Sequence, residues 1–221
     1  MAYGFAIEVW GDHALFTRPE LSVERMTYDV PTPSAVRGII ESIYWHPGMR
    51  IVVDRIQVLN PIEFTTVRRN EVKSKALGPA LRSAATGKGQ LPYINTKDDI
   101  QQRAAVVLRD VRYVFEFHFE MTDKANESDN PGKFADILRR RIEKGQCYSQ
   151  PYFGTREFPV YFKACPDGIR PGGAYQQTDE RDFGLMLFDM DYSKPDDIVP
   201  MFYRAVMRNG VIDVSESEVY R

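Results

Sequence analysis

Cysteine is scarce in this sequence, with two residues among 221. Cys147 and Cys165 are too few for a disulfide framework, and their spacing does not match the close cysteine pairs of metal knuckles. Long apolar runs are also missing, and no signal-peptide pattern opens the chain. These absences predict a cytoplasmic protein with no membrane-spanning part.

Several common catalytic and nucleotide-binding motifs are absent as well. The lysine flanked by glycines at 87–89 lacks the spacing and the Ser or Thr of a phosphate-binding loop. The patterns of zinc peptidases, serine hydrolases and dinucleotide-binding domains do not occur. The three histidines, His13, His46 and His118, are far apart in the sequence. We therefore expect neither a metal site nor a bound cofactor.

The net charge is small, at −2, but it is unevenly distributed. Residues 50–115 contain 12 basic and 6 acidic side chains, whereas the segments on either side are neutral or acidic. The densest basic stretch consists of Arg68, Arg69, Lys73, Lys75, Arg82 and Lys88. Such a stretch is typical of a surface that binds a polyanion. A solubilising loop is the alternative.

Periodicity in the first half of the chain predicts strands around one helix. Residues 5–10 alternate between apolar and polar side chains, as in a half-buried strand. Thr32-Pro33 has the residue types of a helix N-cap and first position, and Pro47-Gly48 is the predicted helix stop. The apolar stripe of this helix consists of Val36, Ile39, Ile40 and Ile43. Runs at 51–59 and 62–67 predict two more strands.

The second half repeats the pattern of strand, helix and strand. Residues 111–121 alternate, with every second side chain apolar and a polar opposite side that only Val114 interrupts. A second helix is predicted to start at Asn130-Pro131 and to have Gly145 just past its end. Its expected buried residues are Phe134, Ile137, Leu138 and Ile142. Residues 158–164 are predicted to form the next strand.

This element order predicts an α+β protein with a ferredoxin-like, RRM-like βαββαβ domain over residues 1–165. A basic insertion, at about 61–104, separates the second and third strands. Within it, residues 74–100 lack periodicity and are predicted to be irregular or mobile. Residues 166–221 contain a strand candidate at 183–188 and are predicted to form a small C-terminal β-sheet extension.

Two residues carry a chemical signal beyond packing. Tyr44 flanks the apolar stripe of the first helix, so its ring can pack while its hydroxyl reaches an edge. Lys133 lies in the first turn of the second helix, where the helix dipole disfavours a cation unless an anion is held nearby. A packed tyrosine and an exposed, tolerated lysine are the alternatives.

Two loops after the second helix combine glycine with aromatic, basic or amide side chains. The residues concerned are Lys144, Gly145, Gln146, Tyr152, Gly154 and Arg156. Aromatic rings stack on bases, arginine holds phosphates, and glycine allows close approach of the backbone, so these loops are predicted to contact nucleic acid. A structural turn is the alternative.

Five sequence blocks, in a common order, resemble one CRISPR-associated family. The blocks are GDHALFT at 11–17, YDVPT at 28–32, GIIESIYW at 38–45, FGTRE at 153–157 and AVMRNG at 205–210. The family is the fifth CRISPR-associated group, d variant, of the repeat-associated mysterious protein superfamily. Its members are the crRNA-processing endoribonucleases of subtype I-C systems. The resemblance extends over residues 5–212.

The resemblance implies a ferredoxin-like body with a C-terminal β-sheet extension. It also implies metal-independent cleavage of precursor CRISPR RNA at the base of the repeat hairpin. The protein would then stay on the crRNA 5′ handle as a subunit of the subtype I-C surveillance complex, which acts in antiviral defence. Binding of duplex DNA is a further implied property.

The family's catalytic tyrosine and lysine fall on Tyr44 and Lys133. The histidine that follows the lysine in other members is Phe134 in this sequence. The family's run of glycines and arginines after the second helix is reduced to Gly145-Gln146-Cys147-Tyr148. The resemblance therefore supplies two of the expected catalytic groups and leaves the general acid unassigned.

The resulting hypothesis is cleavage by the 2′-hydroxyl of the RNA, which gives a 2′,3′-cyclic phosphate and a 5′-hydroxyl. Tyr44 would orient or deprotonate the 2′-hydroxyl, and Lys133 would neutralise the phosphate or protonate the leaving oxygen. His46 is the candidate for the missing acid, although residues two apart diverge on a helix.

The basic insertion has a separate expected role in binding. Its phosphate contacts would grip the RNA stem and set the affinity without taking part in the chemistry. The residues expected to make these contacts are Arg68, Arg69, Lys73 and Lys75. The alternative function is a non-catalytic subunit that binds the crRNA 5′ handle and leaves the cutting to another protein.

Overall fold

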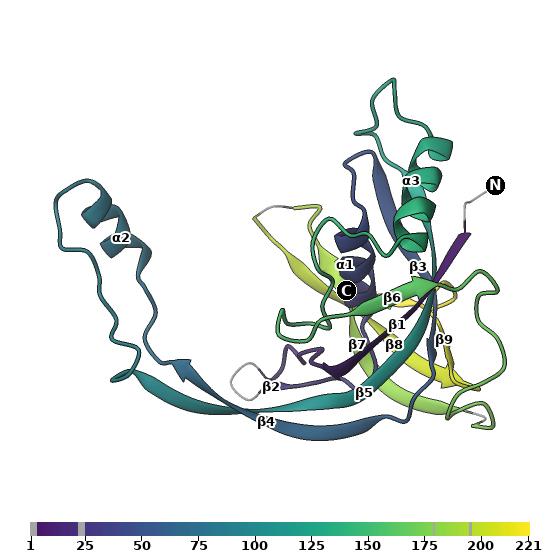
Figure 1. The fold of residues 1–221 in the computed structure, drawn as a ribbon, viewed down its shortest axis with the longest axis horizontal. Helices are drawn as coiled ribbons and strands as arrows, with labels where there is room; N and C mark the ends of the chain where they lie inside the picture. The colour runs from purple at the N-terminus through teal and green to yellow at the C-terminus, as the bar shows by residue number, and fades with distance from the viewer. Residues whose placement is uncertain (1–3, 22–24, 179, 195) are drawn as a thin grey trace. The chain divides into compact units, whose positions relative to one another are not determined.

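The computed structural model describes residues 4–21, 25–178, 180–194 and 196–221, which form an α+β fold with a mostly antiparallel sheet and three helices (Figure 1). The elements are β1 (Gly4–Ala14), β2 (Arg25–Met26), α1 (Pro33–Ile43), β3 (Met49–Val58), β4 (Glu63–Val72), α2 (Gly78–Ala85), β5 (Ile100–Met121), α3 (Pro131–Glu143), β6 (Tyr161–Ala164), β7 (Arg181–Asp191), β8 (Val199–Arg208), β9 (Val211–Asp213) and β10 (Val219–Tyr220). They group into two compact units, one of residues 1–65 and 106–221 and one of residues 66–105. The predicted α+β class is confirmed.

The larger unit is built around four strands in the spatial order β3-β5-β1-β6. Each neighbouring pair in this set is antiparallel. The chain passes through α1 between β1 and β3, and through α3 between β5 and β6. α1 packs against β3 and α3, and α3 packs against β6, so the ends of the two helices are brought close together.

The side chains of β5 point alternately to an apolar face and to a polar face of this sheet, as the sequence alternation predicts. The apolar side chains of β5 in the larger unit, each at most 5% exposed, are those of Val111, Tyr113, Phe115, Phe117 and Phe119. The residues between them face the other way. Apart from the buried Val114, they are polar and form ion pairs across the sheet, such as Glu116 with Arg55 and Glu120 with Arg50.

α1 starts as predicted and ends earlier than predicted. Thr32 is the N-cap, and its hydroxyl accepts a hydrogen bond from the Ala35 N–H at 3.2 Å. The four predicted stripe residues are all buried. The helix ends at Ile43, before the predicted stop at Pro47, because Tyr44 already has an extended backbone.

α3 has both of its predicted caps. The Asn130 side chain accepts a hydrogen bond from the Lys133 N–H at 2.9 Å. At the other end Gly145 has φ +62°, and the Gln146 N–H reaches back to the Arg141 carbonyl at 2.8 Å, which is a Schellman cap. Of the four residues expected to be buried, Ile137 is only half-buried, and Ala135 is buried beside Phe134.

The segment between β4 and β5 contains a helix that was predicted to be irregular chain. α2 lies within residues 74–100, its N-cap Leu77 makes no side-chain hydrogen bond, and the helix buries no residue. α2 is only eight residues long and buries none of them, so its sequence offers too few positions for a buried stripe to be recognised. β5 begins at Ile100, ahead of the predicted start, and pairs with β4.

The C-terminal strands continue the main sheet. β9 pairs with β3, where Ile212 lies opposite Ile56, and β8 pairs with β7, β9 and β10. The strand candidate at 183–188 is the middle of β7. In the part of the chain that the structure describes, no helix is both long enough and apolar enough to cross a membrane.

Candidate active site

The residues expected to be catalytic meet around the ring of Phe134. Phe134 is fully buried near the start of α3 and packs edge-on against Phe119 of β5, with ring centroids 6.3 Å apart. The Tyr44 ring lies 6.3 Å from Phe134, and the His46 ring lies 4.9 Å from it. Lys133 precedes Phe134 in the chain. Phe134 therefore holds the end of α1 against the start of α3.

Tyr44 and His46 contact the same ring because α1 stops before them. Tyr44 has φ −153° and ψ 127° and is the C-cap residue of the helix. In an extended chain, side chains two residues apart point to the same side, whereas on a helix they diverge. The expected divergence of these two residues is wrong, since it assumed a helix that continued to Pro47.

Tyr44 is 8% exposed and lies beneath a cation. The Arg141 guanidinium is 5.1 Å from the centre of the Tyr44 ring and donates a hydrogen bond to the Ile43 carbonyl at 2.6 Å. Burial raises the pKa of the Tyr44 hydroxyl above its usual value, although the charges of Lys133 and Arg141 oppose the rise. The hydroxyl is therefore protonated at neutral pH and can donate or accept a hydrogen bond.

A buried carboxylate, Asp129, links Lys133 to His46. Its side chain is 1% exposed and accepts hydrogen bonds from the Asn126 N–H at 3.1 Å and from Lys133 Nζ at 3.1 Å. Nδ1 of His46 is 3.8 Å from the same carboxylate. Desolvation raises the pKa of Asp129, but these hydrogen bonds and the charges of His46 and Lys133 outweigh it and lower the pKa overall.

Lys133 is held on one side and open on the other. Its ammonium contacts Asp129 and, at 3.5 Å, the Ser128 carbonyl, yet 43% of its side chain is exposed. Asp129 is an anion next to the N-cap of α3, which offsets the unfavourable position of a lysine in the first turn. The exposed side of the ammonium is free to meet a phosphate.

His46 is oriented by a backbone hydrogen bond. Its Nδ1 accepts the Gly48 N–H at 3.0 Å, so the neutral ring carries its hydrogen on Nε2. Nδ1 of the ring also lies 3.8 Å from the Asp129 carboxylate. His46 therefore has its Nε2–H available as a hydrogen-bond donor.

Asp129 and Arg141 are the two site residues that the sequence analysis missed. Asp129 precedes Lys133 by four residues, a spacing at which opposite charges meet on a helix. Arg141 follows Phe134 by seven residues and so shares its face of α3. Both spacings are visible in the sequence, but neither is specific enough to single out a residue.

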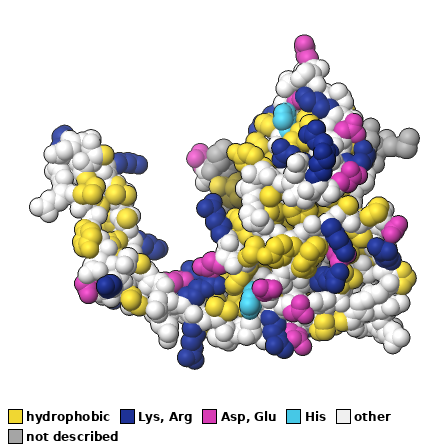
Figure 2. Space-filling model, viewed as in Figure 1, with side chains coloured by type: hydrophobic (Ala, Val, Ile, Leu, Met, Phe, Trp, Pro, Cys, Tyr) yellow, Lys and Arg dark blue, Asp and Glu magenta, His cyan; other side chains and the backbone are white. Residues whose placement is uncertain are grey.

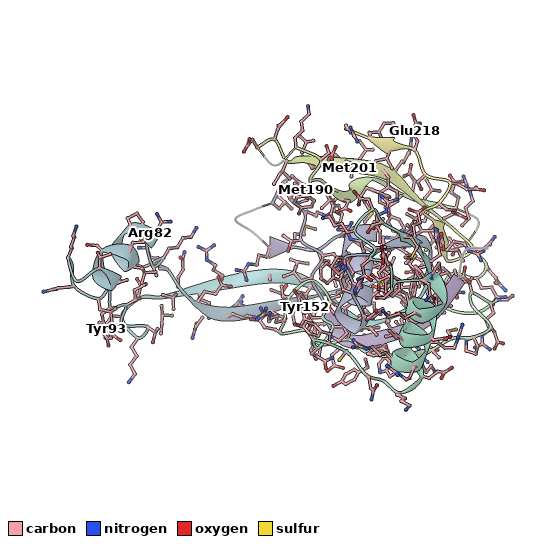
Figure 3. All side chains as sticks on the ribbon, turned by 90° about the horizontal axis from the view of Figure 1, so that it is seen from above. Arg82, Tyr93, Tyr152, Met190, Met201 and Glu218 are labelled. Carbon is pink, nitrogen blue, oxygen red and sulfur yellow. The ribbon has the colours of Figure 1, made fainter. Side chains whose placement is uncertain are left out.

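All four basic residues expected to bind the RNA stem belong to the unit of residues 66–105. Arg68 and Arg69 are consecutive on β4 and therefore face opposite sides. Lys73 and Lys75 follow β4, and their side chains are exposed. Figure 2 shows basic and hydrophobic side chains side by side on this unit, which also contains Arg82 and Tyr93, labelled in Figure 3.

Lys144, Gly145 and Gln146 form the C-terminal cap of α3. Lys144 is the C-cap residue, and the Gly145 N–H donates to the Ile142 carbonyl at 3.2 Å. All three residues are exposed. The positive φ of the cap explains why a glycine stands at position 145. Contact of this turn with RNA stays a prediction.

Tyr152 and Gly154 line a pocket of about 350 Å³ beside α1, whose Gly38 and Ser42 form part of its wall. Tyr152, labelled in Figure 3, and the exposed Arg156 lie on the same loop. This loop packs against the chain after β1, since the Leu15 N–H donates to the Phe153 carbonyl at 3.1 Å. The pocket is therefore lined both by the predicted RNA-binding loop and by α1, the helix that ends just before Tyr44.

Replacing Gly154 with alanine is expected to destabilise the protein by about 3 kcal/mol or more. Gly154 has φ +80°, and an added Cβ would lie 1.8 Å from the Leu15 carbonyl oxygen. Thermal unfolding followed by circular dichroism measures the loss. Gly38→Ala is the matched control, because nothing lies within 4 Å of its added Cβ and alanine favours a helix. Equal melting temperatures for Gly154→Ala and the wild type would contradict the close packing of this loop.

Comparison with known proteins identifies the family. The family model for CRISPR-associated protein (Cas_Cas5), type Cas5d, matches residues 4–215. The chain belongs to the Cas5d family. The resemblance found in the five sequence blocks is therefore confirmed.

Two curated relatives of the Cas5d family match almost the full chain. A protein of Mannheimia succiniciproducens is 45% identical over 217 residues, covering 97% of this chain and 96% of that protein. A protein of Thermus thermophilus is 37% identical over 235 residues, covering 97% of this chain and 94% of that protein. Both carry the name CRISPR pre-crRNA endoribonuclease Cas5d.

Two solved structures share the fold. One, described as a CRISPR-associated protein, has a TM-score of 0.70 and 25% identity and covers 100% of this chain and 97% of that one. The other is the functionally uncharacterised protein SMU1763c from Streptococcus mutans, also with a TM-score of 0.70 and 25% identity, with 100% and 98% coverage. The α+β arrangement of this Cas5d chain is thus one that solved structures also have.

Proposed function

We propose that this chain is a CRISPR pre-crRNA endoribonuclease, the activity by which its two curated relatives are named. The observation that carries the proposal is the meeting of Tyr44, His46 and Lys133 around Phe134, with Asp129 beneath them. These residues come from two separate helix ends, so their convergence requires the fold. Together they offer a hydrogen-bonding hydroxyl, an imidazole and a cation at one place.

The reaction that suits this set is an internal attack within the RNA. The 2′-oxygen attacks the adjacent phosphorus, the bond from phosphorus to the 5′-oxygen breaks, and the products are a 2′,3′-cyclic phosphate and a 5′-hydroxyl. The reaction needs in-line geometry, removal of the 2′ proton, charge stabilisation and a proton for the leaving oxygen. We propose that side chains supply the geometry, the charge stabilisation and the proton for the leaving oxygen without a metal ion, and that solvent water takes the 2′ proton.

Each residue of the cluster has a role in this proposal. Tyr44 orients the 2′-hydroxyl, because its raised pKa keeps its own hydroxyl protonated. Lys133 stabilises the negative phosphate oxygens through the exposed side of its ammonium. His46 donates a proton to the leaving 5′-oxygen. Phe134, at the position of the family histidine, has no polar group with which to do this. Asp129 touches none of the reacting atoms and positions Lys133.

Replacing Asp129 with asparagine is expected to slow RNA cleavage about tenfold or more, the kinetic equivalent of losing one hydrogen bond to a charged group. Asparagine keeps the volume but loses the charge that holds Lys133 and faces His46. Single-turnover rates at saturating RNA measure the effect, and RNA affinity should change little. Asp136→Asn is the matched control, because Asp136 is an exposed carboxylate on α3, the helix that carries Lys133. A wild-type rate for Asp129→Asn would exclude Asp129 from positioning Lys133.

We propose that Arg68, Arg69, Lys73 and Lys75 contact phosphates of the RNA stem. Changing all four to glutamine is expected to weaken RNA binding and to reduce the slope of log affinity against log salt by about 3, or somewhat less than one per contact. Filter binding over a range of salt concentrations measures the slope. The cleavage rate at saturating RNA should not change. An unchanged salt slope would place the RNA on another surface.

The strand order supports a ferredoxin-like assignment for the domain of residues 1–165, with the basic insertion at about 61–104 and the extension at 166–221. The order β3-β5-β1-β6, with α1 and α3 as the connections, fits the split βαβ plan. In such folds the sheet and the loops at its ends are the usual RNA-binding surfaces.

We also propose that the protein keeps hold of the crRNA 5′ handle and acts as a subunit of the subtype I-C surveillance complex. Support comes from the unit of residues 66–105, where Leu77, Leu91 and Tyr93 are strongly exposed beside basic residues. Exposed apolar residues of this kind favour a protein partner. Co-purification of other complex subunits with the full chain tests this, and a gel shift with duplex DNA tests DNA binding.

A non-catalytic subunit that binds the 5′ handle is the second candidate. The observation that favours it is Phe134, which occupies the position of the family histidine and cannot move a proton. The two candidates differ when purified protein is incubated with labelled cognate repeat RNA in excess EDTA. Cutting at one position supports the nuclease, whereas tight binding with intact RNA supports the handle-binding subunit.

A further inference from the structure

An exposed aromatic pair lies on the polar face of the main sheet. Trp10 of β1 and Tyr161 of β6 are opposite each other in the strand register. Their ring centroids are 6.2 Å apart with an interplanar angle of 25°. Tyr161 is 54% exposed and Trp10 is half-buried. Two nearly parallel rings at an open sheet surface can accept a further ring by stacking.

A buried carboxylate fixes two cations beside this pair. Glu8, on the same face of β1, is 7% exposed and pairs with Lys163 at 3.0 Å and with the Arg112 Nε at 2.6 Å. Lys163 Nζ lies 5.9 Å from the Trp10 ring. The three charged groups sum to one positive charge. Arg112 and Lys163 are therefore held in place before any ligand arrives, and an anionic group can meet them without first ordering them.

A pocket of about 310 Å³ adjoins the two cations. Trp10 and the cations Arg112 and Lys163 line it together with Asn60, Gly11 and Val111. Two carboxylates, Asp12 and Asp110, also line it and offset the charges of the two cations. Its volume is within the range of small-ligand sites. The two carboxylates accept hydrogen bonds, which suits the amino groups of a base, while the arginine and lysine suit a phosphate.

We propose that this pocket and the Trp10–Tyr161 pair bind one unpaired nucleotide of the RNA. The identification of the nucleotide as RNA rests on the proposed function. The base stacks on the aromatic pair and its phosphate contacts Arg112 and Lys163. An unpaired nucleotide is specified because stacking needs a free base face, which a base within a duplex does not offer.

The site is separate from the candidate active site. Trp10 and Arg112 alternate along their strands with Val9 and Tyr113, which are buried on the apolar face of the sheet. Phe134 packs on that apolar face through Phe119. The nucleotide site therefore binds a flanking part of the RNA on the opposite face and takes no part in the chemistry.

The first test compares two RNAs, a bare repeat hairpin and the same hairpin with its single-stranded flanks. Tyr161→Ala is expected to lower the affinity for the flanked RNA about tenfold, the typical loss for one base-stacking contact. Affinity for the bare hairpin and the cleavage rate at saturating RNA should not change. Tyr192→Ala, at another exposed tyrosine, is the control. Equal affinities of Tyr161→Ala and wild type for the flanked RNA would overturn the site.

The second test uses tryptophan fluorescence. The chain has two tryptophans, so Trp45→Phe leaves Trp10 as the sole reporter. A short single-stranded RNA from the repeat flank is expected to quench Trp10 emission to saturation, and Tyr161→Ala in the same background should weaken that binding. Emission that does not respond to RNA would overturn the site. Quenching in this variant, together with a wild-type chain that cuts no repeat RNA, would keep the site and overturn the proposed nuclease.

Discussion

Replacing Lys133 with alanine is expected to slow cleavage of repeat RNA about 100- to 1000-fold, the usual cost of removing one group that stabilises charge in the transition state. Lys133 is the cation whose open side can reach a phosphate in this cluster, and Asp129 holds its other side at 3.1 Å. Charge on the phosphate oxygens is greatest in the transition state, so the loss should fall on the rate more than on affinity. Single-turnover kinetics at saturating RNA measure it.

Two variants serve as controls for Lys133. Arg139→Ala removes an exposed cation from the same helix and should leave the rate within about twofold of wild type. Lys133→Arg keeps the charge but replaces a compact ammonium with a planar group, so it should recover only part of the activity. A Lys133→Ala protein that cuts at the wild-type rate would remove Lys133 from the mechanism.

Replacing Tyr44 with phenylalanine is expected to slow cleavage by about 100-fold or more while leaving stability almost unchanged. The change removes only the hydroxyl, and the ring keeps its contacts with Phe134 and with the Arg141 guanidinium. A loss of rate without a loss of stability would therefore report on the hydroxyl itself. The measurement pairs single-turnover kinetics with a thermal melt.

Tyr148→Phe is the matched control for Tyr44, since Tyr148 is an exposed tyrosine whose ring makes no stacking contact in the described structure. It should cut RNA at the wild-type rate. Wild-type cleavage by Tyr44→Phe would show that the 2′-hydroxyl is oriented by another group. A large fall in melting temperature would instead show that the hydroxyl has a structural role.

The parts of the fold that follow from local chemistry could be predicted from the sequence. Thr32 and Asn130 are N-caps in the structure because their side-chain oxygens accept a free N–H of the first turn. Gly145 ends α3 because its positive φ costs glycine little. The alternation along β5 gave the correct buried face because side chains on a strand point alternately to its two sides.

The parts that depend on packing between distant segments could not be read in this way. The role of Asp129 arises because its carboxylate is buried against Lys133 and His46, and burial is not visible in a surface-like stretch of Asn, Ser and Asp. At the early end of α1 the Ile43 carbonyl accepts a hydrogen bond from Arg141 and Tyr44 contacts Phe134, and both partners come from a distant part of the chain. α2 escaped prediction because it buries no face.

The most direct test of the account uses two cognate repeat RNAs that differ in one atom. One is all-ribose, and the other has a single 2′-deoxy sugar at the mapped cut site, with excess EDTA in both reactions. The account predicts cutting of the first RNA to products with a 2′,3′-cyclic phosphate and a 5′-hydroxyl, and no cutting of the second. Equal cleavage of both RNAs, or a requirement for added metal, would contradict it.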